Sequence, residues 1–189
     1  MLGYPNKKKV QQKVHTTANL GMTLESDIES TNQYYLSHHI AVIHKKPTPI
    51  QVVNVSYPAR NKAKITEAYY RTPSTTDFNG LYKGKYIDFD CKETNSKTSF
   101  PLANVHEHQI LHLTDVNEHG GIAFLIVGWK MYNEYYLLTF NDLLTIWNDS
   151  KNGGRKSIPY EFFKEKGIPI PFSYQPRLDY LKAVDKLLG

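Results

Sequence analysis

The sequence predicts an α/β protein in which a mixed β-sheet is flanked by helices. Segments with helical spacing of apolar residues alternate with short β-prone runs, which is the element order of such a sheet. One run, IAFLIVGW at 122–129, is apolar almost throughout, as strands buried on both faces are. The 189 residues, 40% of them hydrophobic, suffice for one compact domain. We therefore expect a single domain at 19–189 behind a disordered basic tail at 1–18.

The domain is expected to begin with a helix and to continue with two strands. Apolar residues between Leu24 and Leu36 recur at helical spacing, with acidic residues in the early turns, which favours a helix over about 20–37. Residues 40–44 and 50–55 are β-prone and are separated by two prolines. We interpret these two runs as strands around a turn.

The middle of the chain carries the clearest strand pattern. Asn79-Gly80 and Lys83-Gly84 are turn signals, and strict alternation follows them from residue 86 to residue 92. Successive side chains of a strand point to opposite faces. One face therefore carries Ile87, Phe89 and Cys91, and the other carries Tyr86, Asp88, Asp90 and Lys92.

The second half of the chain adds helices and two more strands. Pro101 is expected to open a helix that runs to about Asn117 and is closed by Gly120-Gly121. Beyond it we expect a strand at 122–129, a second strand at 134–140 beside it, a short amphipathic helix at 140–149, a loop at 152–159 and a closing helix from Pro176 onward.

All of the net charge of +5 falls in one segment. The whole chain holds 23 basic and 18 acidic residues, but residues 44–71 alone hold six basic residues and one acid, so the remainder is neutral. Tyrosines are interleaved with these cations, a mixture that suits phosphate contacts and stacking on bases or sugars. The alternative is a solvated hairpin with ordinary surface lysines. The candidate DNA-binding residues are Lys45, Lys46, Arg60, Lys62, Lys64, Tyr70 and Arg71.

Composition and spacing exclude several classes of protein. No apolar run resembles a signal peptide or a membrane span, so we expect a soluble, cytoplasmic protein. The single cysteine, Cys91, excludes a disulfide framework, and alternation makes it an inert core thiol. The sequence from His106 fails the H-E-x-x-H pattern of zinc hydrolases because residue 110 is Ile. His108 and His112 are interpreted as surface histidines.

The candidate chemistry is phosphodiester hydrolysis. This reaction needs oxygen ligands for Mg²⁺, a polarised water and a cation near the charge that develops on the phosphate. Asp90 and Lys92 share a strand face, and the hairpin before them can bring Asp77 alongside. Alternatively, the acids cap turns and Lys92 protects an edge strand. The catalytic interpretation gains from the charged residues that crowd a strand which otherwise belongs in the core.

Gln109 is a second indication of a site. It lies in the middle of the apolar face of the helix predicted after Pro101, so its amide points toward the sheet. A buried amide needs partners. The partners of this amide are either a neighbouring strand edge or the carboxylates. If they are the carboxylates, Gln109 binds a ligand or positions water. Spacing leaves both interpretations open.

The segment TPSTTDFNGLYKGKYIDFDCKETNSKTSFPLANVHEHQ resembles the central signature of the RecU resolvases, members of the PD-(D/E)xK nuclease superfamily. The helix from Gly21 to Tyr35, the tract around Arg60 and GGIAFLIVGW also resemble RecU in order and spacing, so the resemblance covers most of residues 18–175. It implies a restriction-endonuclease-like nuclease core into which the basic segment, about 44–71, is inserted as a projecting stalk.

The resemblance implies a Mg²⁺-dependent endonuclease that resolves four-way (Holliday) junctions in DNA recombination and repair. Mn²⁺, which is larger and tolerates more varied geometry, is the candidate substitute for Mg²⁺. Lys92 would stabilise the transition state, and Glu25 on the first helix would assist. RecU sequences usually have Glu where this chain has Asp90, which brings the activity into question without excluding it. The residues implied to surround the metal ion are Thr75, Asp77, Asp90 and Gln109.

The resemblance also implies partners. The stalk would enter the centre of the junction. A four-way junction is nearly two-fold symmetric and needs two matched nicks, so one site per chain implies a homodimer. Modulation of the RecA recombinase is a further implied activity. Two alternatives stay open: another nuclease of the superfamily that cuts linear duplex and needs no stalk, and a junction-binding or recombinase-regulating protein whose site is weakened at Asp90.

Overall fold

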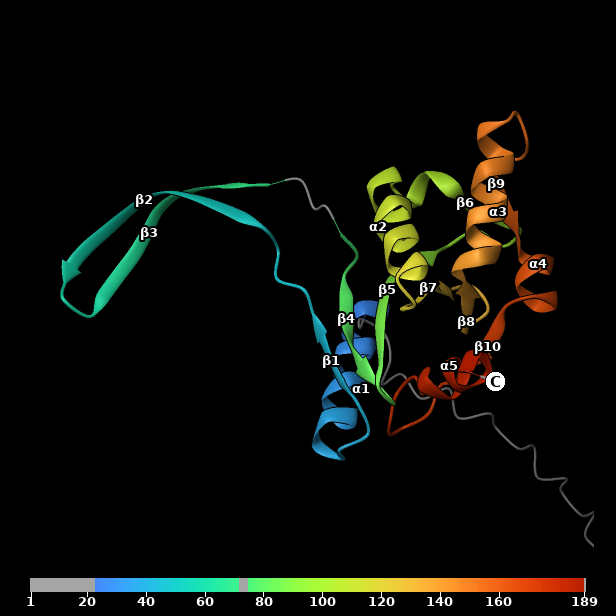
Figure 1. Ribbon diagram of the computed structural model, residues 1–189, viewed down its shortest axis with the longest axis horizontal. Coiled ribbons are helices and arrows are strands. Elements are labelled where there is room, and N and C mark those ends of the chain that lie inside the picture. The colour runs from blue at the N-terminus through green and yellow to red at the C-terminus, as the bar shows by residue number, and fades with distance from the viewer. Residues whose placement is uncertain (1–22, 72–74, 189) are drawn as a thin grey trace, which may run out of the picture.

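The predicted fold class is confirmed by the computed structural model, which describes residues 23–71 and 75–188 and contains a six-stranded mixed sheet flanked by helices (Figure 1). The predicted tail at 1–18 lies outside these residues. The elements are α1 Leu24–Ser37, β1 Val42–Lys45, β2 Ile50–Ala59, β3 Lys62–Tyr70, β4 Phe78–Tyr82, β5 Lys85–Thr94, β6 Ser99–Pro101, the 3₁₀ helix η2 Leu102–Asn104, α2 Glu107–Glu118, β7 Ile122–Trp129, β8 Glu134–Thr139, α3 Phe140–Lys151, β9 Ser157–Pro159, α4 Tyr160–Glu165, β10 Ile168–Ile170 and α5 Leu181–Leu188.

The main sheet has the strand order β1-β4-β5-β7-β8-β10. Strands β5 and β7 pair in parallel, and the other neighbouring strands pair antiparallel. Both faces of the β7 strand are buried, as its apolar sequence predicts. Strand β5 lies in the interior of the sheet, so Lys92 does not protect an edge strand.

The two faces of the sheet are covered by different helices. Helices α1 and α5 pack on the face that carries Ile87, Phe89 and Cys91. Helices α2, α3 and α4 pack on the opposite face, against Leu125 and Val127 of β7. This second face carries the charged residues of β5, in agreement with the predicted alternation.

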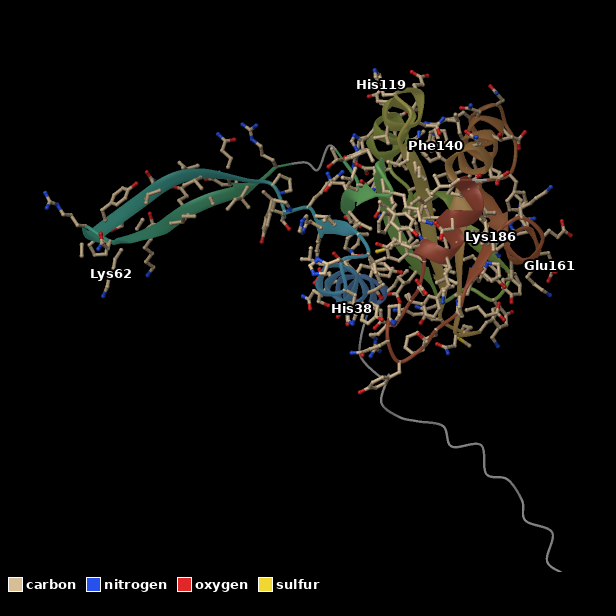
Figure 2. The ribbon with its side chains drawn as sticks, turned by 60° about the horizontal axis from the view of Figure 1, so that its bottom comes forward. His38, Lys62, His119, Phe140, Glu161 and Lys186 are labelled. Atoms are coloured by element: carbon tan, nitrogen blue, oxygen red, sulfur yellow. The ribbon has the colours of Figure 1, made fainter. Side chains whose placement is uncertain are left out.

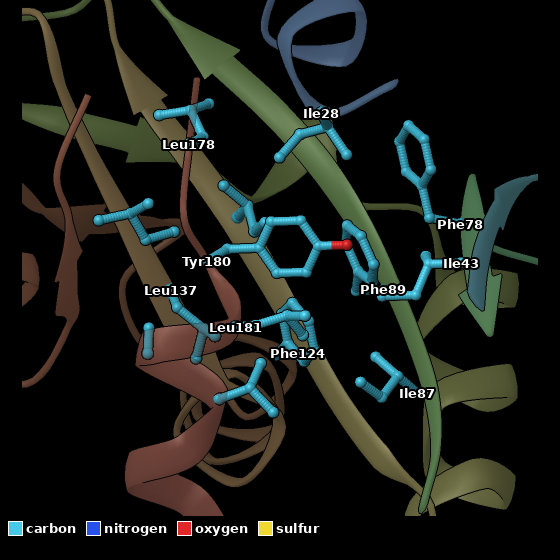
Figure 3. Close-up of a cluster of buried hydrophobic side chains, with 14 of the residues drawn as sticks. Ile28, Ile43, Phe78, Ile87, Phe89, Phe124, Leu137, Leu178, Tyr180 and Leu181 are labelled. Carbon is cyan, nitrogen blue, oxygen red and sulfur yellow. The ribbon is translucent and has the colours of Figure 1, made fainter. Parts of the chain in front are cut away.

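An aromatic stack crosses the first face of the sheet (Figure 3). The Phe89 ring lies between those of Phe78 and Phe124, with centroid distances of 5.2 and 4.6 Å. The fully buried Tyr180, which precedes α5, packs against Phe89 at 5.1 Å. The stack joins β4, β5 and β7, and it therefore fixes the positions of the strands that carry the polar residues of the other face.

We expect Phe124→Ala to lower the free energy of unfolding by about 3–5 kcal/mol, because it removes a fully buried ring from this stack and leaves a cavity. Urea unfolding followed by circular dichroism measures the loss. The control is Leu111→Ala, at a side chain 62% exposed, which should change stability by less than about 0.5 kcal/mol. Equal effects of the two substitutions would contradict the assigned core.

The predicted pairing of the first two strands is wrong. Strand β1 pairs with β4 in the main sheet, whereas β2 pairs with β3. The two prolines between β1 and β2, Pro47 and Pro49, separate the strands instead of forming a tight turn, because the chain leaves the sheet there. Strands β2 and β3 form a hairpin that projects from the rest of the molecule, here called the stalk hairpin (Figure 1).

Several predicted boundaries and turns also differ. Lys83-Gly84 does form a turn, with positive φ at both residues, but Gly80 lies within β4. A Cβ at Gly80 would lie 2.1 Å from the Val42 carbonyl oxygen, so close strand approach explains this glycine. Residues 157–159 of the predicted loop form strand β9, and α4 and β10 were not predicted. Within residues 23–71 and 75–188, no helix is both long and apolar enough to span a membrane.

The predicted starts of three helices need correction. Helix α1 begins at Leu24, because the Thr23 hydroxyl accepts from the Ser26 amide and caps it. Pro101 ends a strand and precedes a 3₁₀ turn, and α2 begins only at Glu107 because Val105 is extended. The closing helix begins at Leu181 instead of near Pro176.

Candidate active site

Asp90 and Lys92 occupy the interior strand β5, on the face covered by α2. The Asp90 side chain is 1% exposed, and its Oδ2 lies 2.9 Å from the Lys92 ammonium. Its Oδ1 accepts a hydrogen bond from the Cys91 amide at 2.9 Å. Burying a carboxylate is unfavourable unless it is paired, so the strand holds this acid together with its cation. Burial raises the pKa of the Cys91 thiol, which agrees with the predicted inert core thiol.

Asp77 lies opposite Asp90 by the register of the sheet. Phe78 of β4 pairs with Phe89 of β5, and continuing this antiparallel pairing by one residue places the two aspartates across from each other. The pKa of Asp77 is raised to about 7, first by burial and then by the hydrogen bond to Asp90 and its negative charge. Two carboxylates this close compete for protons, and a cation between them would relieve their repulsion.

The Gln109 side chain faces the carboxylates and not a neighbouring strand edge. Gln109 is the third residue of α2 and is buried. Its amide nitrogen donates to Asp90 Oδ2, and its amide oxygen accepts from the His106 backbone N–H at 3.1 Å. The side chain therefore joins the start of α2 to the buried acid of β5.

Thr75 and Glu25 lie near the site without touching its carboxylates in the described contacts. The Thr75 hydroxyl donates to the Thr76 carbonyl at 3.4 Å. Glu25, in the first turn of α1, forms a 2.8 Å ion pair with Lys45. The positive charge of Lys45 opposes the rise in the pKa of Asp77 that burial and Asp90 cause, so Glu25 is linked to the site through Lys45.

The predicted DNA-binding residues fall into two groups. Lys45 and Lys46 lie at the base of the stalk hairpin and are ion-paired, Lys45 with Glu25 and Glu29, and Lys46 with Asp88. The other five lie on the hairpin or at its end, where every residue except Glu67 is exposed (Figure 2). These five are Arg60, Lys62, Lys64, Tyr70 and Arg71.

The donors at this site fit a small divalent cation. The strand register places the carboxylates of Asp77 and Asp90 across from each other, and such hard oxygen ligands suit Mg²⁺. Nowhere in the described chain do three or more His, Cys, Asp or Glu side chains gather in a way that could hold a metal ion. The site would therefore supply two carboxylates and complete the coordination with neutral oxygens and water.

One polar cluster beside the site was not predicted. Asp88, two residues before Asp90 on the same face of β5, is fully buried and contacts both Lys46 and His112. The sequence placed Lys46 in the DNA-binding segment and His112 on the surface. The crowding of acids on this strand was a signal for the cluster, but its partners lie far away in the sequence.

The mixed sheet gathers two carboxylates and a lysine around its interior strand β5, an arrangement that fits a nuclease of the PD-(D/E)xK class. Residues 19–186 match the model of the family described as "Recombination protein U", RecU. The chain belongs to this family.

Relatives of nearly equal length carry the name Holliday junction resolvase RecU. The protein of Oceanobacillus iheyensis is 54% identical over 197 aligned residues, which cover 98% of this chain and 99% of its own. The protein of Bacillus cereus is 51% identical over 191 residues, covering 96% of each chain. The protein of Bacillus mycoides is 50% identical over the same span.

Proposed function

We propose that this chain is a Mg²⁺-dependent endonuclease that resolves four-way DNA junctions as a homodimer in the cytoplasm. The observation that carries this proposal is the register of β4 and β5, which brings Asp77 and Asp90 together beside Lys92. The relatives are named for junction resolution, and the exposed basic hairpin beside the site offers cations to DNA phosphates.

The residues of the site would have different roles in metal binding and in catalysis. Asp77 and Asp90 would hold the ion, and Thr75 and Gln109 would complete its surroundings. A bound Mg²⁺ supplies Lewis acidity and lowers the pKa of a coordinated water. Lys92, whose ammonium lies 2.9 Å from Asp90, would face the negative charge that develops on the scissile phosphate.

Gln109 and Glu25 have supporting parts in this proposal. The Gln109 amide donates to Asp90 and so fixes the orientation of that carboxylate. Glu25 would act on the site through its ion pair with Lys45. Neither side chain needs to leave its present position for these roles.

The stalk hairpin supports the proposed homodimer. A two-stranded hairpin is only marginally stable alone in water. Its apolar side chains Ile50, Val53 and Ile65 are between 47% and 50% exposed, so they are available to a second chain. Modulation of RecA stays an expectation from the family.

The metal requirement is tested by titrating Mg²⁺ into the protein with a labelled four-way junction, with EDTA and Ca²⁺ as comparison conditions. We expect nicking in Mg²⁺ and none in EDTA. In Ca²⁺ we expect binding without nicking, because Ca²⁺–oxygen distances are longer than those of Mg²⁺ and its coordination geometry is less regular. Undiminished nicking in EDTA would refute the metal site. Analytical ultracentrifugation in parallel tests the dimer.

Asp90→Glu is expected to lower the rate of nicking in Mg²⁺. Asp77 lies directly opposite Asp90, so the shorter carboxylate is already close to its partner and a longer one would crowd the site. Mg²⁺ tolerates little departure from a regular octahedron with ligands at about 2.0–2.1 Å. Rates of the wild type and the variant in Mg²⁺ and in Mn²⁺ test this. A large gain for the glutamate variant in Mg²⁺ would instead support the alternative of a junction-binding protein with a weakened site.

A further inference from the structure

A buried polar cluster centred on Asp88 lies beside the proposed metal ligands. Asp88 Oδ2 lies 2.8 Å from the Lys46 ammonium, accepts from the Tyr86 hydroxyl at 2.7 Å and lies 2.9 Å from His112 Nε2. Asp88 Oδ1 accepts from the hydroxyl of Thr76, which is 3% exposed. These partners come from β5, from α2 and from the two chain segments on either side of the stalk hairpin.

The cluster connects directly to the backbone of Asp77. The Lys46 ammonium also donates to the Thr76 hydroxyl at 3.0 Å, and the Lys46 backbone N–H donates to the Asp77 carbonyl at 2.7 Å. Thr76 is the residue before Asp77 in the chain. The backbone around Asp77 is therefore held by two contacts that both lead to Asp88.

The mechanism proposed above does not use Asp88. A buried carboxylate is unfavourable unless its partners are well placed. Here one carboxylate gathers a cation from the segment that enters the stalk hairpin and a hydroxyl from the segment that leaves it. Groups in this second layer set the orientation of the groups that bind a metal.

We propose that Asp88 is a positioning residue that, through Lys46 and Thr76, holds Asp77 opposite Asp90 and fixes the root of the stalk hairpin to β5. This inference rests on the proposed function, because it takes Asp77 as a metal ligand. It also links the two parts of the protein: a shift of the hairpin root at Lys46 would reach Asp77 directly, through the hydrogen bond from the Lys46 amide, and indirectly, through Thr76.

The test uses Asp88→Asn and Thr76→Val in the full-length protein. Asp88→Asn removes the charge that pairs with Lys46, and Thr76→Val removes the hydroxyl while keeping the shape of the side chain. Three quantities are measured: the single-turnover nicking rate at saturating protein, the junction Kd in EDTA, and the affinity of DNA-free protein for Mn²⁺ by calorimetry. We expect both variants to lose about 10–100-fold in rate or in Mn²⁺ affinity, with little change in junction Kd.

Two matched variants separate positioning from a role in folding. Thr76→Ser retains the hydroxyl and should recover the wild-type values. Tyr86→Phe removes a different hydrogen bond, the one to Asp88 Oδ2. The Tyr86 hydroxyl has no connection to Asp77, so this variant should nick at close to the wild-type rate. Thermal unfolding of each variant accompanies these measurements.

The outcomes separate the two proposals. Wild-type rates and Mn²⁺ affinities for Asp88→Asn and Thr76→Val would overturn the positioning role. Losses in Thr76→Ser or Tyr86→Phe as large as that in Thr76→Val would also overturn it, because the cluster would then serve the fold alone. If the wild type does not nick at all, the proposed function fails, and Mn²⁺ binding by the variants still decides whether Asp88 positions Asp77.

Discussion

Asp77→Asn should reduce the nicking of a four-way junction by at least about 10²–10³-fold, while the affinity for the junction stays close to that of the wild type. The amide keeps the size of the side chain but removes one of the two anionic oxygen ligands. Affinity resides in dispersed cations and is therefore spared. Lys92→Met should have a comparable effect, because it removes the ammonium beside Asp90. Single-turnover nicking and filter binding on the same junction measure both quantities.

The matched control for Asp77→Asn is Glu118→Gln, which also neutralises one acid but lies exposed at the end of α2. It should nick at the wild-type rate. Near wild-type nicking by Asp77→Asn or Lys92→Met would show that the active-site assignment is wrong. A loss of junction binding equal to the loss of nicking would show that these residues serve binding instead of chemistry.

Among the proposed variants, the one in which Arg60, Lys62 and Lys64 are neutralised together is expected to lose the most affinity for the junction. Each phosphate contact that is lost should lower the slope of log K against log salt by roughly 0.9. All three residues lie exposed on the stalk hairpin, where no described ion pair competes for them (Figure 2). Binding of the junction and of a matched linear duplex, measured over a range of salt concentrations, gives both slopes. The loss should be smaller for the duplex.

The control for this triple variant removes the same charge elsewhere. Lys151, Lys164 and Lys182 lie on α3, α4 and α5, away from the hairpin (Figure 1). Their neutralisation should leave the salt slope for the junction almost unchanged. An unchanged slope in the hairpin variant would mean that the hairpin is only a solvated projection, and equal slopes in both variants would mean that net charge alone governs binding.

Short-range sequence patterns correctly predicted the local features of the fold, namely strand faces, strand burial and one turn. Alternation assigned the two faces of β5, since side-chain direction in a strand depends only on position along it. The apolar run of β7 indicated a strand buried on both faces, and Lys83-Gly84 indicated a hairpin turn. From the alternation it followed that Asp90 and Lys92 share one face of β5.

Contacts between distant segments could not be predicted in the same way. The β-prone residues of β1 and β2 did not reveal that β1 pairs with β4 and β2 with β3, because pairing depends on the whole sheet. The Asn79-Gly80 turn signal was misleading because close approach to β1 requires glycine there. The ion pairs of Lys45 and Lys46 join residues far apart in the sequence, so charge counting assigned both lysines to DNA alone.

The most direct test of this account is one cleavage experiment on a synthetic four-way junction whose strands are separately labelled. The wild-type protein in Mg²⁺ is expected to introduce two nicks in strands of like polarity at symmetric positions, and to leave a linear duplex of the same sequence uncut. Equal cutting of the linear duplex would favour the duplex-cutting alternative. Binding of the junction without nicks in Mg²⁺ would contradict the central claim that Asp77, Asp90 and Lys92 form an active nuclease site.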